Sequence, residues 1–78
     1  MSKEKLRENA KTLKQYMDFR AKKENLENEL DEKFFNDSFE NGVFTLFGIE
    51  CNPENGEIIK DNQNPEAYKE FNKKETLN

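Results

Sequence analysis

The sequence contains no histidine, no tryptophan and a single cysteine, Cys51. A lone cysteine cannot close an intrachain disulfide, and without histidine it cannot supply the ligand set of a zinc or haem site. We therefore expect no metal and no cofactor. Nucleophilic and general acid–base catalysis need matched groups, usually with histidine or an activated cysteine, so we expect that the protein is not an enzyme.

Glycine and long apolar runs are also scarce. The three glycines lie far apart, at positions 42, 48 and 56, which excludes a glycine-rich phosphate loop. No segment approaches the ~18 consecutive apolar residues of a membrane span, and residues 1–25 lack the apolar stretch of a signal peptide. We expect a cytoplasmic protein with no membrane contact.

What is present is a short and highly charged chain. It has 78 residues, 17 acidic and 13 basic side chains, a net charge of −4 and 32% hydrophobic residues. A chain of this length buries only about 60% of the surface that its unfolded form exposes. The sequence therefore predicts a single small domain over residues 1–78, with a small core.

The charge is unevenly distributed along the chain. Residues 1–23 carry eight basic and three acidic groups, a net charge of +5, whereas residues 24–78 carry five basic and fourteen acidic groups, a net charge of −9. We describe these parts as a basic helical arm (1–23) and an acidic α+β body (24–78). Such asymmetry guides association with charged partners, including a second copy of the chain.

The first half of the chain has the composition of a helix. Neither glycine nor proline occurs between Ser2 and Phe35, so the sequence predicts an α-helix over about 3–35. Its apolar residues form two stripes about 125° apart, which one straight helix cannot bury against a single surface. Either the chain turns back near Arg20 to Asn25 as a helical hairpin, or the N-terminal half of a continuous helix faces a partner. We favour the continuous helix.

The second half of the chain has the pattern of an α+β fold. Apolar and β-branched residues over about 43–51 and 57–61, separated by the turn residues 52–56, predict a β-hairpin. Asn64 and Pro65 form a helix start, which predicts a short C-terminal helix over about 65–74. We expect this helix to cover the second face of the hairpin.

The stripe on the N-terminal half supplies the candidate partner-binding residues. Its apolar centre is flanked by basic side chains, a layout typical of a helix that docks in a groove. The candidates are Leu6, Ala10, Leu13 and Met17, with Lys3, Arg7, Lys11 and Lys14 as the charged rim. The sequence therefore favours a small protein-binding protein, an inhibitor or adaptor of a larger protein.

Two other functions remain open. The basic arm can pair with the acidic body or the arm of a second copy, which predicts a homodimer or a larger structural assembly. Nucleic-acid binding through the basic helix is less favoured, because the chain has only two arginines and its body repels a polyanion. The acidic residues could also imitate the phosphates of DNA, but ordinary solubilisation is the favoured interpretation.

The composition resembles that of one broad group of proteins. Eleven lysines against two arginines, together with eleven asparagines, are typical of AT-rich codons. In this the chain is similar to the accessory proteins that phages and plasmids of AT-rich bacteria carry. That resemblance implies an anti-defence or host-takeover factor, and it carries no motif from which a functional residue follows.

Overall fold

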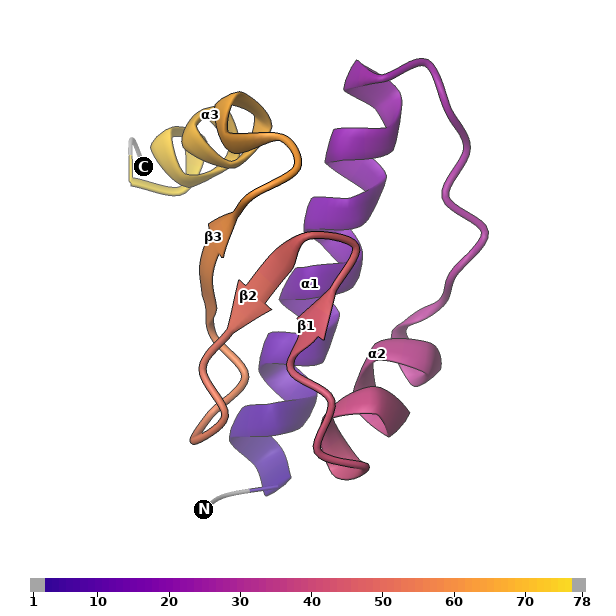
Figure 1. Ribbon diagram of the computed structural model, residues 1–78, viewed down its shortest axis with the longest axis vertical. Coiled ribbons are helices and arrows are strands. Elements are labelled where there is room, and N and C mark those ends of the chain that lie inside the picture. Colours follow the sequence, from indigo (N-terminus) through magenta and orange to yellow (C-terminus); the bar gives the residue numbers. More distant parts are fainter. Residues whose placement is uncertain (1–2, 77–78) are drawn as a thin grey trace.

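The lysine- and glutamate-rich N-terminal segment forms helix α1, Lys3–Lys23, in a computed structural model that describes residues 3–76 (Figure 1). The continuous helix predicted over 3–35 is wrong beyond Lys23. Asn25 has a φ of 58°, and the N–H of Leu26 donates a 2.8 Å hydrogen bond to the carbonyl of Ala21. This bond from the third residue after Lys23 back to the last turn of the helix is the Schellman ending, in which asparagine replaces the more common glycine.

A second helix follows an extended segment. Residues 24–31 are not helical, and helix α2 then spans Glu32–Glu40. The Asp31 side chain caps it by accepting a 2.9 Å hydrogen bond from the N–H of Phe34. Helix α2 packs against α1 and buries Phe35 and Phe39, so the helical hairpin that we considered the less favoured alternative is the one observed.

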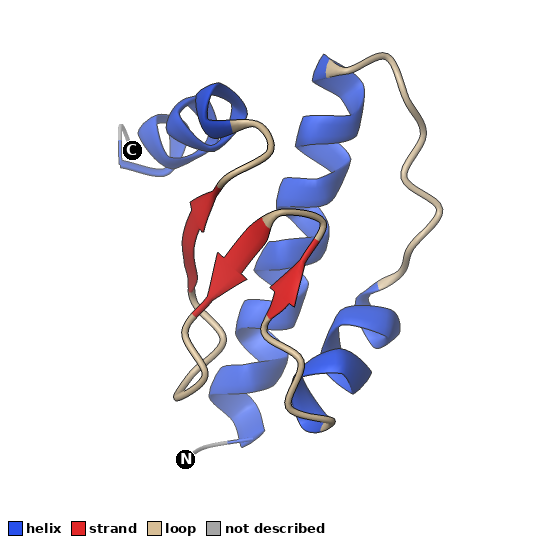
Figure 2. Ribbon diagram, in the orientation of Figure 1, coloured by secondary structure: helices blue, strands red, loops and turns tan. Residues whose placement is uncertain are grey.

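The β-rich segment forms a sheet of three short antiparallel strands in the order β1-β2-β3 (Figure 2). The strands are β1 (Thr45–Leu46), β2 (Ile49–Cys51) and β3 (Ile58–Asp61). The single strand predicted over 43–51 is therefore wrong at its centre, because Phe47 and Gly48 form a turn there. The strand predicted over 57–61 is confirmed as β3.

Helix α3 spans Pro65–Thr76, which confirms the predicted C-terminal helix. As expected, Asn64 caps it, accepting a 3.2 Å hydrogen bond from the N–H of Ala67. The predicted contact with the second face of the hairpin is wrong. Helix α3 packs on α1 and β3 instead, with the ring of Phe71 centred 5.2 Å from that of Tyr16, and the outer sheet face keeps the exposed residues Thr45 and Lys60.

All elements share one hydrophobic core, which confirms the α+β class. Helix α1 lies behind the sheet in Figure 1, with α2 on one side of it and α3 on the other. Because α1 supplies much of this core, it is not a detached arm. Within residues 3–76, no helix is both long and apolar enough to cross a membrane.

Candidate docking surface

The four apolar residues predicted to meet a partner are buried inside the chain. Ala10 and Leu13 have 0% exposure, and Leu6 and Met17 have 6% and 7%. They form the core together with residues of α2 and the sheet. The predicted partner contact of these side chains is thus corrected: the turn at Asn25 brings α2 back onto the stripe and covers it.

The predicted basic rim does lie at the surface. Lys3, Arg7 and Lys11 are exposed on α1, and Lys14 is partly buried. The Nζ of Lys14 forms a 2.5 Å ion pair with the carboxylate of Asp18, one turn further along the helix. A partner-binding role for these four cations stays a prediction.

Two aromatic side chains that were not among the predicted partner-binding residues are exposed. Phe34, in the first turn of α2, is 38% exposed, and Phe47, in the turn between β1 and β2, is 43% exposed. Their ring centroids lie 6.2 Å apart, so the two rings form one aromatic surface from separate elements. Gly48 was the only signal of this turn in the sequence. Asn-Gly is the typical pair at such a hairpin turn, and here phenylalanine stands in the place of asparagine.

Phe47 has an unusual backbone conformation for its residue type. Its φ is 54° and that of Gly48 is 81°, and type I′ turns require positive φ at both central residues. The left-handed region costs a residue with a Cβ roughly 1–2 kcal/mol. Gly48 cannot be replaced easily, because a Cβ on it would lie 2.7 Å from the Cβ of Gln63. Turn preference therefore explains Gly48, but it does not explain phenylalanine at position 47.

A buried polar network holds this turn from beneath. The Nη1 of Arg20 donates a 2.9 Å hydrogen bond to the carbonyl of Phe47 and another of 2.9 Å to Oδ2 of Asp61. The hydroxyl of Tyr16 donates to the same Oδ2 at 2.6 Å. The other oxygen, Oδ1, accepts two backbone N–H groups at 2.9 and 3.0 Å. The network thus connects α1, the end of β3 and the aromatic turn.

Burial and hydrogen bonding determine the charges in this network. Burial acts to raise the pKa of Asp61, but the hydrogen bonds from Tyr16, Arg20 and the backbone outweigh it and hold that pKa below its ordinary value. Burial, and then the bond to Asp61, raises the pKa of Tyr16 well above its ordinary value. At neutral pH the network therefore contains an ionised carboxylate, a guanidinium and a neutral phenol.

Between α1 and α2 the chain passes through an acidic segment, residues 24–32, with five acidic residues and no basic one. The side chains of Glu27, Glu29 and Glu32 are exposed and make no ion pair or hydrogen bond with any residue in the described range 3–76. The backbone of the segment is fixed, because Asn28 donates a 2.9 Å hydrogen bond to Asp18 on α1. We define the docking surface as the exposed aromatic pair, Phe34 and Phe47.

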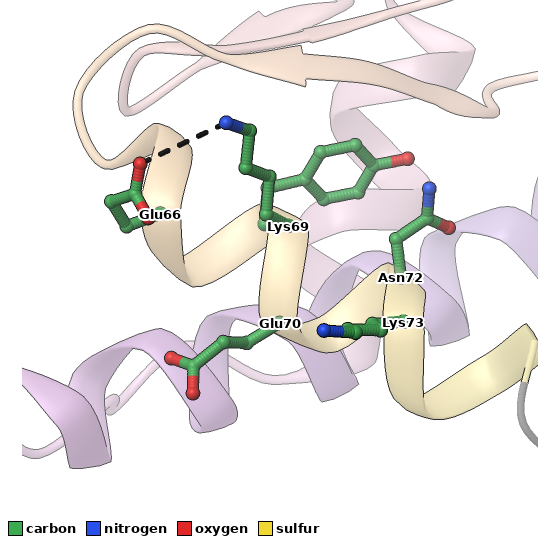
Figure 3. Close-up of a pocket in the computed structure, with 6 residues that line it drawn as sticks. Glu66, Lys69, Glu70, Asn72 and Lys73 are labelled. Carbon is green, nitrogen blue, oxygen red and sulfur yellow. Dashed lines mark ion pairs between the residues drawn. The ribbon is translucent and has the colours of Figure 1, made fainter.

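Other parts of the described chain offer less chemistry. Cys51 is buried, and burial raises the pKa of its thiol to about 12, so the thiol is protonated at neutral pH. Residues 3–76 contain no cluster of three or more histidine, cysteine, aspartate or glutamate residues that could hold a metal ion. A hollow along α3 carries mixed charges, including an ion pair of 3.9 Å between Glu66 and Lys69 (Figure 3). Mixed charge on one exposed helix is typical of a solvent-facing surface.

No family model, curated protein or solved structure matches this chain. Its function is therefore inferred from its own residues.

Proposed function

We propose that this chain is a non-enzymatic protein-binding protein, an inhibitor or adaptor that acts in the cytoplasm on a larger protein. The observation that carries the proposal is the exposed aromatic pair, Phe34 and Phe47, whose rings lie 6.2 Å apart. Aromatic residues are enriched at the centres of protein interfaces, where a few of them supply most of the binding energy. The composition favours a phage- or plasmid-encoded factor against a host or defence enzyme.

The geometry of the turn supports this role. Arg20 holds the carbonyl of Phe47 at 2.9 Å, and the side chain of Arg20 is itself only 7% exposed. The backbone that presents the aromatic ring is therefore ordered before any partner arrives. A preordered surface loses less conformational entropy on binding, which strengthens the complex without adding a contact.

Two alternatives have weaker support. The exposed Lys3, Arg7 and Lys11 on α1 and the acidic segment 24–32 are complementary, which favours self-assembly into a homodimer or larger structure. However, two copies that each carry a net charge of −4 repel one another. The same three cations favour nucleic acid, which the net charge of −9 on residues 24–78 opposes.

The test is affinity capture by the tagged chain from lysate of its own cellular background, with and without nuclease. We expect the tagged chain to recover one larger protein, in equal amounts from the nuclease-treated and the untreated lysate. Phe34→Ala should reduce its recovery by about tenfold, which corresponds to about 1.4 kcal/mol. Ile59→Ala is the matched control, because Ile59 is also apolar and is 55% exposed, on β3.

Three results would count against the proposal. Recovery that disappears with nuclease would favour nucleic acid, and recovery of only the chain itself would favour assembly. Equal losses with Phe34→Ala and Ile59→Ala would show that the aromatic pair is not the contact.

A further inference from the structure

We propose that Asn41 is a site of spontaneous covalent modification, where the folded chain converts asparagine to aspartate and isoaspartate, and that the fold protects the equivalent residue Asn55. This modification is independent of the protein-binding function. In the sequence the tripeptide Glu-Asn-Gly occurs twice, at residues 40–42 and 54–56. Because the two sites share these three residues, the structure around each site sets the difference between their rates.

Asparagine followed by glycine rearranges without an enzyme. The backbone nitrogen of the glycine loses its proton to water or hydroxide and attacks the Cγ of the asparagine side chain, which forms a C–N bond and closes a five-membered imide. The side-chain amide nitrogen takes up a proton and leaves as ammonia. Water then opens the imide at either of its two carbonyl carbons, which gives aspartate or isoaspartate. Glycine favours the attack because it has no Cβ to block the approach.

The fold holds the peptide group between Asn55 and Gly56 at both of its polar atoms. The N–H of Gly56 donates a 2.6 Å hydrogen bond to the carbonyl of Asn52. The carbonyl of Asn55 accepts one of 2.7 Å from Nδ2 of Asn9 on α1. Gly56 is also buried, and a Cβ on it would lie 2.7 Å from the ring of Phe39. The rotation that the attack requires would therefore displace a core side chain.

The peptide group between Asn41 and Gly42 is held less firmly. Both residues are exposed, and a Cβ on Gly42 would have no atom of the described residues within 4 Å apart from its chain neighbours. The ψ of Asn41 is 6° and must rotate before the nitrogen of Gly42 faces Cγ. This rotation breaks the 3.0 Å hydrogen bond from the N–H of Gly42 to the carbonyl of Phe39. That bond lies at the end of an exposed helix, and such ends open at a low cost in free energy.

The modification changes the charge at the end of α2. A carboxylate replaces an amide at the C-terminal end of a helix, where negative charge is unfavourable and where the last turn of α2 has no basic residue. The carboxylate also cannot donate the 2.9 Å hydrogen bond that Nδ2 of Asn41 gives to the carbonyl of Asp37. Because α2 supplies Phe35 and Phe39 to the core, we expect the modified chain to be less stable.

The test follows both sites by peptide mass spectrometry in the full chain, incubated at physiological temperature and mildly alkaline pH. In the folded chain we expect Asn41 to convert at least about tenfold faster than Asn55, because the two peptide groups differ in the free energy of local opening. In urea the two sites should convert at similar rates, since their sequences are alike. Peptides with aspartate and with isoaspartate at position 41 should both form.

Variants connect the modification to its effect. Asn41→Gln should prevent the slow appearance of a more acidic form on ion exchange, because the longer glutamine side chain forms an imide much more slowly. Asn55→Gln is the matched control and should become acidic at the rate of the unmodified chain. Asn41→Asp should lower Tm by about 3 °C. An unchanged Tm for Asn41→Asp would contradict the expected loss of stability.

Three results would overturn the proposal. The first is equal rates of conversion at Asn41 and Asn55 in the folded chain. The second is a folded chain that keeps Asn41 intact under conditions in which the chain in urea converts it. The third is an Asn41→Gln variant that becomes acidic as fast as the unmodified chain, which would place the modification at another residue.

Discussion

At Phe47 the preference of the backbone and the identity of the side chain conflict. The turn requires a left-handed residue, and asparagine or glycine adopts that conformation at lower cost than phenylalanine. The conformation itself is well supported, since Arg20 binds the carbonyl of Phe47 at 2.9 Å. In the proposed function, the exposed ring of Phe47 is retained in order to contact a partner protein.

This conflict predicts that Phe47→Asn stabilises the protein. Relief of roughly 1–2 kcal/mol in the backbone exceeds the loss of a half-exposed ring contact worth about 0.5–1.5 kcal/mol. We expect a net gain of about 0.5 kcal/mol and a rise in Tm of about 3 °C by thermal unfolding. Gly48→Ala, in the same turn, should lower Tm. A lower Tm for Phe47→Asn would show that the ring has a structural role.

The buried carboxylate of Asp61 predicts how stability depends on pH. Its folded pKa is below its ordinary value of 3.8, so the ionised form stabilises the folded state above about pH 4. That contribution is lost as the pH falls through the folded pKa. We expect the free energy of unfolding, measured with urea between pH 5 and pH 2, to fall less for Asp61→Asn than for the unmodified chain.

Asp61→Asn should also be less stable at neutral pH, because it leaves the buried Arg20 with only the more distant carboxylate of Glu24, at 3.8 Å, as an ionic partner. Asp18→Asn is the control: its carboxylate also has a lowered pKa, through Lys14, but it is far more exposed. If the free energy of unfolding had the same pH dependence in Asp61→Asn and in the unmodified chain, the loss of stability in acid could not be assigned to Asp61.

Pattern analysis could not find this network. Tyr16 and Arg20 are separated from Asp61 by 45 and 41 positions, and a single sequence does not show which distant residues meet. The apolar stripe was recognised correctly as Leu6, Ala10, Leu13 and Met17. The burial of this stripe under α2 could not be predicted, because it depends on the path that the chain takes after α1.

At the scale of elements, the ends of helices and strands were the least predictable features. The composition of residues 3–35 favours a helix throughout, and the break depends on one asparagine in the left-handed conformation. The strand pattern over 43–51 failed for the same reason, since Phe47 and Gly48 adopt positive φ. The start of α3 was predicted correctly, because Asn64 and Pro65 act through local chemistry.

The break at Asn25 predicts opposite effects for two substitutions. Alanine is the best helix former, so Asn25→Ala would raise stability if the helix continued. Because Asn25 has a φ of 58°, we expect Asn25→Ala to lower the free energy of unfolding by about 1 kcal/mol. Asn25→Gly should maintain or raise it. Denaturant unfolding of both variants measures the sign of the change in the free energy of unfolding. An increase for Asn25→Ala would contradict the Schellman ending.

At the scale of the whole molecule, the charge asymmetry is real but the two parts are not separate. Apart from the buried Arg20, helix α1 carries its basic residues on its solvent side and the core residues on its other side. The α+β class followed from composition and pattern. The docking surface did not, since it depends on the meeting of α2 and the β1–β2 turn.

The burial of α1 predicts the effect of a charge in its stripe. Leu13 is 0% exposed, so Leu13→Asp places an unpaired carboxylate in the core. A domain of this size is stable by only about 4–12 kcal/mol, and we expect circular dichroism to show an unfolded chain. Lys11→Glu, on the solvent side of the same helix, should retain the folded spectrum. A folded Leu13→Asp variant would mean that the stripe is free to meet a partner.

The central claim is that the chain keeps an exposed aromatic ring at position 47 in order to bind another protein. The most direct measurement is the amount of partner that copurifies with Phe47→Asn relative to the unmodified chain. We predict a folded variant, at least as stable as the unmodified chain, that retains less than about a tenth of the partner. Undiminished copurification would contradict the claim.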